Sequence, residues 1–373
     1  MSAPDAPAAA SDSTAARRDA LLERLDQSVT AMVEVCAIYL GERLGLYAAL
    51  ATNGPLTSSE LATATDTHER YAREWLEQQT LAGLLDVEDR HAAPAERRFR
   101  LPPGHAEALA DPASLNYWTP QARLAVGSVL PVHAVLEAFR TGGGVPFAAY
   151  GADVRDGMAD ARRVSFLQLM GTEWLPAMPD VHARLQSDPS ARVADIGIGA
   201  GWSSIAIARA YPNVQVDAFD LDAASVELAR RNVDEAGLGD RVHVHQRDAG
   251  DPSLAGCYDL VTVFFCVHDL TDPVAALTAM RQLTGDDGTV LVVDGRVAEQ
   301  FLGEETDRDV ERQSYGFSLL HCLPVGMTET PAAGTGKVMR PDMLRGYARD
   351  AGFRDVEILP IDDAWSAFYR LLA

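Results

Sequence analysis

The second half of the chain alternates short β-rich runs with helical runs. From residue 192 onward, apolar stretches of about five residues are bounded by turn residues, which is typical of strands buried in a sheet. Helical patterns separate them, for example at 223–236 and 273–283. Strand–helix alternation of this kind predicts an α/β fold with a mostly parallel sheet covered on both faces. The predicted strands are 192–196, 214–219, 242–246, 260–264, 289–293, 356–359 and, returning antiparallel, 364–371.

The first half is mainly helical and carries one hairpin. Apolar positions recur at helical spacing from residue 21 to about 50. A capping box at Thr57 and Glu60 opens a second helix, and Asp66 is expected to open a third that runs to about residue 81. Two short strands follow, at 84–87 and 99–101. Three helices followed by a hairpin predict a winged helix.

Composition shifts divide the chain into three expected parts. Residues 1–20 are rich in alanine, serine and proline, and we expect them to form a disordered tail. Residues 21–150 are expected to form the helical winged-helix domain, which ends near the glycine run that begins at Gly142. Residues 151–373 are then expected to form the α/β domain.

The charge balance disfavours two classes of partner. The 373 residues include 32 basic and 54 acidic side chains, a net charge of −22. The winged-helix region from 31 to 100 holds 11 acidic and 7 basic side chains, so it is poorly suited to DNA. We therefore expect neither nucleic acid nor a membrane as partner. Four scattered cysteines and the lack of a long apolar run favour a cytoplasmic location.

A glycine-rich loop closes the first predicted strand. Asp195 is followed by Gly197, Gly199 and Gly201, and the next predicted helix starts directly after them. An open α/β sheet binds nucleotides at this point. Trp202 stands where a dinucleotide fingerprint has a glycine, so the loop does not fit a pyrophosphate. The loop suits a ligand without phosphate, with Asp195 near a positive ammonium group.

Acidic residues also end the next two predicted strands. Asp220, followed by Leu221, ends the second strand, where a carboxylate can accept both hydroxyls of a ribose. Asp248 and Ala249 end the third strand, where they are placed to take an adenine amino group. Three acids around one glycine loop are better explained by a shared ligand than by three separate helix caps.

With these motifs, residues 192–373 resemble the class I S-adenosylmethionine (SAM)-dependent methyltransferases. The resemblance implies a Rossmann-like sheet, mostly parallel with an antiparallel last strand, and SAM as cofactor. It also implies that the glycine loop, Asp220 and Asp248 bind that cofactor.

The fourth predicted strand ends in a histidine motif, His268-Asp269-Leu270-Thr271-Asp272. This pattern is similar to that of small-molecule O-methyltransferases with an N-terminal winged-helix dimerisation domain. In that family the histidine is the general base, and a residue at the end of the fifth strand, here Asp294, orients it. The family commonly has tryptophan where this chain has Leu270. His268, Asp269 and Asp294 could instead hold a divalent metal, but we expect no metal because two of them have competing roles.

An apolar pocket above His268 is expected to hold the methyl acceptor. Met170 and Trp174 share one helical face, and Phe265 precedes the histidine motif. A long insertion at 299–340 carries His321, the alternative general base. Each aromatic residue by itself fits an ordinary core position equally well.

These features predict an O-methyltransferase that acts on a small, fairly apolar acceptor, such as a phenol or another secondary metabolite, and forms a homodimer through its N-terminal domain. In this interpretation His268 removes the hydroxyl proton before methyl transfer. A carbon or nitrogen methyltransferase on the same fold, which would not depend on His268, is the alternative. A SAM-responsive winged-helix regulator is a third and weaker one.

Overall fold

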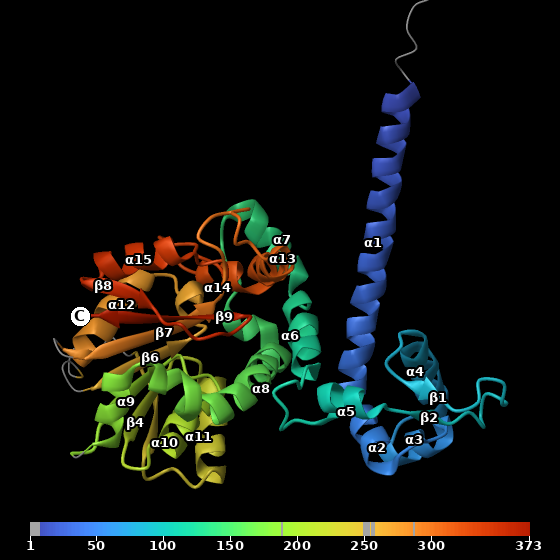
Figure 1. Cartoon of the computed structure of the whole chain (residues 1–373), viewed down its shortest axis with the longest axis horizontal. Coiled ribbons are helices and arrows are strands. Elements are labelled where there is room, and N and C mark those ends of the chain that lie inside the picture. The colour runs from blue at the N-terminus through green and yellow to red at the C-terminus, as the bar shows by residue number, and fades with distance from the viewer. Residues whose placement is uncertain (1–7, 188, 249–253, 255–257, 286–287) are drawn as a thin grey trace, which may run out of the picture. The chain divides into compact units, whose positions relative to one another are not determined.

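The computed structural model describes residues 8–187, 189–248, 254, 258–285 and 288–373. The chain divides into two compact units, residues 1–122 and 123–373 (Figure 1). The boundary that we expected at residue 150 is therefore wrong. Residues beyond 122 pack into the second unit: the Val145 N–H donates to the Pro324 carbonyl over 2.9 Å, and the Tyr150 hydroxyl donates to the Leu320 carbonyl over 2.8 Å.

The first unit has the element order of a winged helix. Its core holds Tyr47, Leu61, Leu76 and Phe99, each at most 1% exposed. β1 and β2 pair antiparallel as the expected hairpin. The elements are α1 (Ala8–Arg43), α2 (Leu46–Asn53), α3 (Ser58–Thr65), α4 (Glu69–Leu81), β1 (Asp86–Val87), β2 (Phe99–Arg100) and α5 (Pro103–Ala110).

Local signals in this unit gave one confirmed and two wrong predictions. The capping box of α3 is present, because Thr57 accepts from the Glu60 N–H and Glu60 accepts from the Thr57 N–H. Asp66 does not open α4: it ends α3 in the left-handed region at φ 51°, and His68 caps α4. The expected disordered tail is wrong for residues 8–20, which belong to α1 because alanine has the highest helix propensity. Residues 1–7 lie outside the described part.

The second unit is a seven-stranded sheet between two helical layers. The strand order is β5-β4-β3-β6-β7-β9-β8, with β9 antiparallel to both of its neighbours. This confirms the expected sheet, including the antiparallel return of the last strand. The strands are β3 (Arg192–Ile196), β4 (Gln215–Asp220), β5 (Val242–Gln246), β6 (Leu260–Phe264), β7 (Thr289–Gly295), β8 (Asp355–Ile358) and β9 (Ser366–Leu372).

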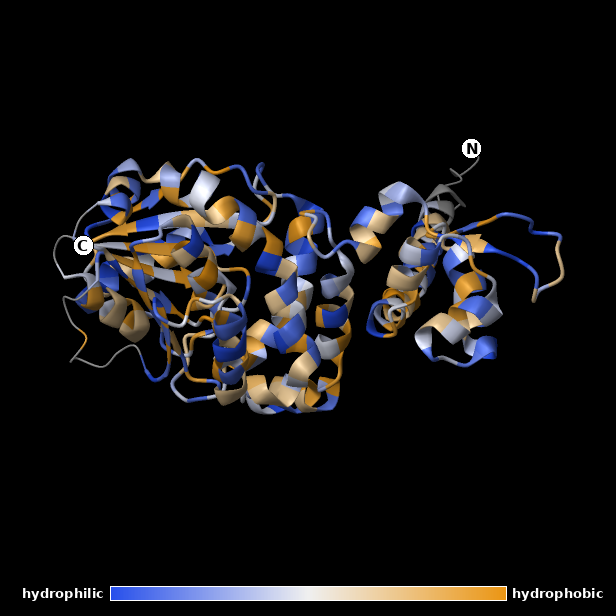
Figure 2. Cartoon of the chain, turned by 90° about the horizontal axis from the view of Figure 1, so that it is seen from below, coloured by the Kyte–Doolittle hydropathy of each residue, from blue (hydrophilic) through white to orange (hydrophobic). Residues whose placement is uncertain are grey.

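Alternating residues of each central strand enter two separate apolar cores. Val193 packs with residues of α9, α10 and α11, whereas Ala194 packs with residues of α12 and α15. Figure 1 shows these two helix groups on opposite faces of the sheet, and Figure 2 shows its strands as mainly hydrophobic. The helices are α6 (Thr119–Val129), which crosses the boundary between the units, α7 (Val132–Thr141), α8 (Gly151–Leu169), α9 (Pro179–Gln186), α10 (Trp202–Ala210), α11 (Ala223–Glu235), α12 (Pro273–Thr284), α13 (Arg308–Phe317), α14 (Leu323–Gly326) and α15 (Pro341–Asp350).

No single described helix has both the length and the apolar composition needed to cross a membrane. Only α6 and α7 together, bent by 55° at their junction, pass that test.

Candidate active site

Asp195 lies inside the sheet at the end of β3 and is fully buried. Its Oδ2 accepts hydrogen bonds from the hydroxyls of Ser203 at 2.5 Å and Ser204 at 2.6 Å, and its Oδ1 accepts from the Thr262 hydroxyl at 2.8 Å. Burial raises the pKa of Asp195, against the effect of these hydroxyls. Both oxygens of Asp195 accept hydrogen bonds from these hydroxyls, and contact with a ligand ammonium group stays a prediction. The carboxyl group fixes the first turn of α10 to β3 and β6.

The glycine loop between β3 and α10 needs glycine at two positions for different reasons. Gly197 has φ 67°, and a Cβ there would lie 2.7 Å from the Cys266 sulfur. Gly199 has φ 51°, and a Cβ there would meet no atom within 4 Å. Gly197 is therefore required because Cys266 packs against it. The absence of a side chain at Gly199 leaves its backbone accessible to a ligand. Gly201 also has a positive φ, 78°.

Asp220 ties the glycine loop to the end of the second strand in the sheet. One of its oxygens accepts from the Gly199 N–H and the other from the Asp222 N–H, each over 2.9 Å. Burial raises the pKa of Asp220. The neighbouring Leu221 is 69% exposed, so its side chain is available to a ligand.

The third expected acid lies at the same edge of the sheet. β5 pairs with β4 so that Gln246 lies opposite Asp220, and the exposed Asp248 follows two residues later. Ala249 lies outside the described residues.

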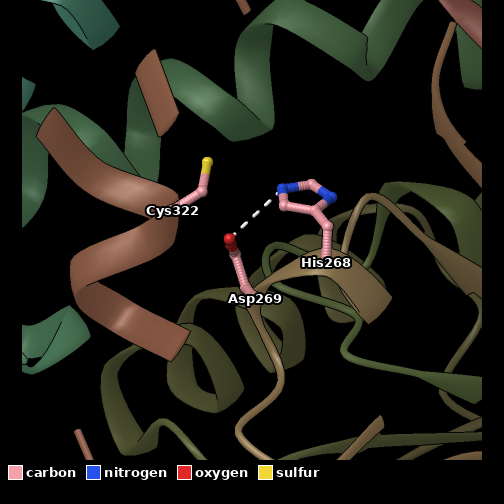
Figure 3. Close-up of side chains that lie close together, drawn as sticks. All are labelled: His268, Asp269 and Cys322. Atoms are coloured by element: carbon pink, nitrogen blue, oxygen red, sulfur yellow. Dashed lines mark ion pairs between the residues drawn. The ribbon is translucent and has the colours of Figure 1, made fainter. Parts of the chain in front are cut away.

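His268 lies in the turn that follows β6 and is held by carboxylates at both ring nitrogens. Its Nδ1 is 2.5 Å from Asp294 Oδ1, and its Nε2 is 3.2 Å from Asp269 Oδ1, the ion pair drawn in Figure 3. His268 is 3% exposed and Asp294 1%. The structure thus brings together the expected pair, and it adds Asp269, which the sequence suggested only as a metal ligand. The adjacency of Asp269 to His268 was the available signal.

The surroundings shift the pKa values of the two histidines of the site in opposite directions. Burial by itself would lower the pKa of His268, but Asp269 and Asp294 raise that pKa well above its ordinary value. Burial lowers the pKa of His321, whose ring packs against that of Tyr150 with their centroids 4.5 Å apart. The surroundings therefore favour the charged form of His268 and the neutral form of His321.

Several polar atoms around His268 have unused hydrogen-bonding capacity. Within the described part of the chain, Asp269 Oδ1, Asp294 Oδ2 and His321 Nε2 are buried and have no hydrogen-bond partner. Native proteins leave few such atoms, and bound water or a ligand commonly satisfies them. These atoms therefore mark a place where a polar ligand group can bind.

The glycine loop and the histidine cluster converge on Cys266. Burial raises the pKa of the Cys266 thiol, and four carboxylates raise it further. They come from the ends of four different strands or the turns after them, namely Asp269, Asp220, Asp294 and Asp195. Asp195, Asp220 and Asp294, which the sequence placed at the ends of separate strands, therefore all act on the thiol of Cys266.

His268, Asp269 and Cys322 have the residue types of a metal site. Figure 3 shows these side chains pointing toward one another, and their potential ligand atoms all lie within 4.8 Å. Burial raises the pKa of the Cys322 thiol, and Asp269 already forms an ion pair with His268. Because carboxylates already lie at both nitrogens of His268, a metal on its Nε2 would have to break the ion pair with Asp269.

The expected acceptor pocket is only partly supported. Met170 and Trp174 are 1% and 2% exposed and lie in the core beneath the sheet, where the Trp174 ring centroid is 5.1 Å from that of Phe368. They belong to the apolar core of the sheet, and their place in the acceptor pocket stays a prediction. Phe265 does lie at the site edge: it is partly buried, has φ 52° and directly follows β6. A positive φ at a non-glycine residue is strained and is typical of functional sites.

Comparison with known proteins agrees with this geometry. The family profile described as a methyltransferase domain matches residues 193–288, which include the glycine loop, Asp220 and His268. The chain carries a methyltransferase domain. Before it, residues 31–111 match an Rv2258c-like winged helix-turn-helix domain.

Solved structures share the fold around this methyltransferase domain. The human N-acetylserotonin methyltransferase, solved with SAM, covers 100% of this chain and 99% of its own, with TM-score 0.70 and 18% identity. The mitomycin 7-O-methyltransferase covers 96% and 100%, with TM-score 0.65 and 21% identity. At these identities the similarity establishes the fold.

Curated relatives match over a short stretch of this chain. The release factor glutamine methyltransferase of Rhodopirellula baltica is 38% identical over 77 residues, which is 21% of this chain and 26% of that protein. The ribosomal protein uL3 glutamine methyltransferase of Bradyrhizobium diazoefficiens is 41% identical over 70 residues, 19% and 22% of the two chains. The chain thus spans about a quarter of the length of the curated relatives that it matches.

Proposed function

We propose that this protein is a SAM-dependent methyltransferase that methylates a hydroxyl group of a small, fairly apolar acceptor. The proposal rests above all on His268, which lies between two carboxylates at the same sheet edge as the glycine loop and Asp220. SAM, when bound, supplies a methyl group on a positively charged sulfur.

The residues of the glycine loop fit such a cofactor. Gly197, Gly199 and Gly201 would form its cradle, with bare backbone at Gly199 facing the ligand. Asp220 accepts backbone N–H groups, and a carboxylate offers about four acceptor sites, so it can still accept a hydroxyl of a ribose. Leu221 and Asp248 would lie along the adenine.

His268 would take the proton from the acceptor hydroxyl. Asp294 holds Nδ1, which leaves Nε2 as the basic nitrogen, as in the histidine of a catalytic triad. Asp269 now faces Nε2, so an acceptor hydroxyl would have to enter between them. Only neutral imidazole accepts a proton, and the raised pKa of His268 therefore places the active form on the alkaline side.

The test combines binding with turnover. Calorimetry should show heat on titration of SAM into the wild-type protein and into His268→Ala alike. With a panel of phenols and radiolabelled SAM, His268→Ala should lower methyl transfer on the order of a hundredfold. Absence of SAM binding to the wild-type protein would overturn the proposal, and turnover within about threefold of wild type would remove His268 as base.

A carbon or nitrogen methyltransferase is the second candidate. Both His268 nitrogens contact carboxylates, which favours a charged histidine. A charged histidine cannot remove a proton, but it can still position the acceptor for methylation on carbon or nitrogen. Unchanged turnover by His268→Ala, together with a product methylated on carbon or nitrogen, would favour this alternative.

The partner that we propose for α1 is a second copy of this chain. α1 has 36 residues and is therefore about 54 Å long, more than its own unit can cover. Apolar side chains along it are 47–63% exposed, an arrangement that a partner helix would bury. They are Leu21, Leu22, Leu25, Val29, Met32, Val33 and Leu40.

A further inference from the structure

One arginine packs against Phe265, at the edge of the candidate site. The Arg162 guanidinium carbon, from α8, is 4.1 Å from the centroid of the Phe265 ring. Its NH1 group is 3.4 Å from the Ser366 hydroxyl, a long hydrogen bond. Within the described part of the chain, no carboxylate oxygen lies within 4.0 Å of this guanidinium.

These contacts place Arg162 at the edge of the sheet that carries the catalytic cluster. Phe265 follows β6 and stands three residues before His268. Ser366 begins β9 and pairs with Gly295, the residue after Asp294. The guanidinium therefore lies above the ends of β6, β7 and β9, on the side of the cluster away from β4 and β5.

A guanidinium in this setting has a strong electrostatic need for an anion. It carries five N–H donors, of which one makes a weak bond, and its side chain is only partly exposed. The negative charges of Asp294 and Asp363 act on it from beyond ion-pair distance, while burial lowers the pKa of Arg162. Contact with the face of Phe265 leaves edge N–H groups available to a planar oxyanion.

We propose that Arg162 binds a carboxylate group of the methyl acceptor, so that the substrates of this enzyme are aromatic or otherwise apolar hydroxy acids. This inference rests on the proposed function, because it assigns the acceptor side of that site. A guanidinium binds a carboxylate through two parallel hydrogen bonds, which would orient the acceptor as well as attract it. The cofactor also carries a carboxylate, but the Ser366 contact draws the guanidinium toward β7 and β9, whereas the glycine loop follows β3. The SAH measurement below distinguishes the two carboxylates.

The experiment compares benzoate with benzamide, which differ in charge and hardly in shape. Binding of each to the full-length protein is measured by calorimetry, with and without S-adenosylhomocysteine (SAH). We expect benzoate to bind the wild-type protein at least tenfold more tightly than benzamide. Arg162→Gln should abolish this preference, and Arg162→Lys should keep only part of it, because lysine retains the charge but lacks the paired donors.

Matched controls separate the site from general charge effects. Arg163→Gln removes the neighbouring arginine, whose guanidinium carbon is 5.5 Å from the Trp202 ring, and should leave the preference for benzoate intact. Thermal unfolding of each variant shows whether the fold is retained. SAH affinity should be the same in Arg162→Gln as in wild type.

Each outcome bears on a different claim. Equal binding of benzoate and benzamide to the wild-type protein, or an undiminished preference in Arg162→Gln, overturns the assignment of Arg162. A loss of SAH affinity in Arg162→Gln also overturns it, since Arg162 would then hold the cofactor's carboxylate. Failure of the wild-type protein to bind SAM or SAH refutes the proposed function instead, whatever the benzoate result.

Discussion

Two glycines of the loop after β3 should respond to alanine in opposite ways. In Gly199→Ala the new methyl group meets no protein atom within 4 Å, so it projects into the proposed ligand space. In Gly197→Ala the methyl group would lie 2.7 Å from the Cys266 sulfur and 3.1 Å from the Cys266 Cβ. The first change should therefore affect binding most, and the second stability most.

The expected sizes follow from backbone strain and packing. Both positions have a left-handed φ, and an L-residue there costs about 1–2 kcal/mol. Gly199→Ala should lower the free energy of unfolding by about that amount and weaken SAM binding at least tenfold, about 1.4 kcal/mol. Gly197→Ala adds overpacking of about 1–3 kcal/mol against Cys266, for a total of about 2–5 kcal/mol.

Chemical denaturation and SAM calorimetry on the two glycine variants, on Cys266→Ala and on the two double mutants decide the matter. Cys266→Ala in the Gly197→Ala background should recover the overpacking part, which a double-mutant cycle reports as a coupling of about 1–3 kcal/mol. The same Cys266→Ala change with Gly199→Ala should show no coupling. Gly199→Ala that binds SAM as well as wild type, or Gly197→Ala that is no less stable than Gly199→Ala, would refute this account of the loop.

Three further predictions concern the cofactor, the histidine and the helix α1. Asp220→Asn should weaken SAM binding at least tenfold in calorimetry, because it removes the charge that accepts the ribose hydroxyls; unchanged affinity would remove Asp220 from the cofactor site. The rate of methyl transfer should rise with pH as His268 loses its proton, and Asp269→Asn should move this rise to lower pH, because loss of the neighbouring carboxylate lowers the pKa of His268. A pH–rate profile that stays in place would contradict this. Val29→Glu combined with Met32→Glu should convert the proposed dimer into a monomer, because both apolar side chains are more than half exposed in the isolated chain and a partner helix would bury them. Sedimentation at micromolar concentration measures this change. A wild-type protein that is already monomeric would rule out the proposed dimer.

The pH prediction has a matched control in the same unit. Asp309 is exposed on α13 and pairs with Arg312, far along the chain from His268. Asp309→Asn removes the same charge from the protein without touching the cluster, so its pH–rate profile should coincide with that of the wild type.

The sequence by itself determined the sheet and the glycine loop. Strands such as β3 and β6 were predicted residue for residue, because a buried parallel strand is a short, mainly apolar run bounded by turn residues. The capping box at Thr57 was also predicted from the sequence, because its two hydrogen bonds join residues three positions apart. Such features depend on spacing alone, which the sequence contains.

Tertiary structure decided what the side chains do at the ends of those strands. Asp195 faces inward to three hydroxyls, Trp174 joins the core, and Asp269 closes the second side of His268. The boundary between the units also depends on long-range contacts, such as that of Val145 with Pro324. Each outcome is fixed by groups that are distant in sequence and packed against one another, because hydrogen bonds and burial depend on proximity in space rather than on order along the chain.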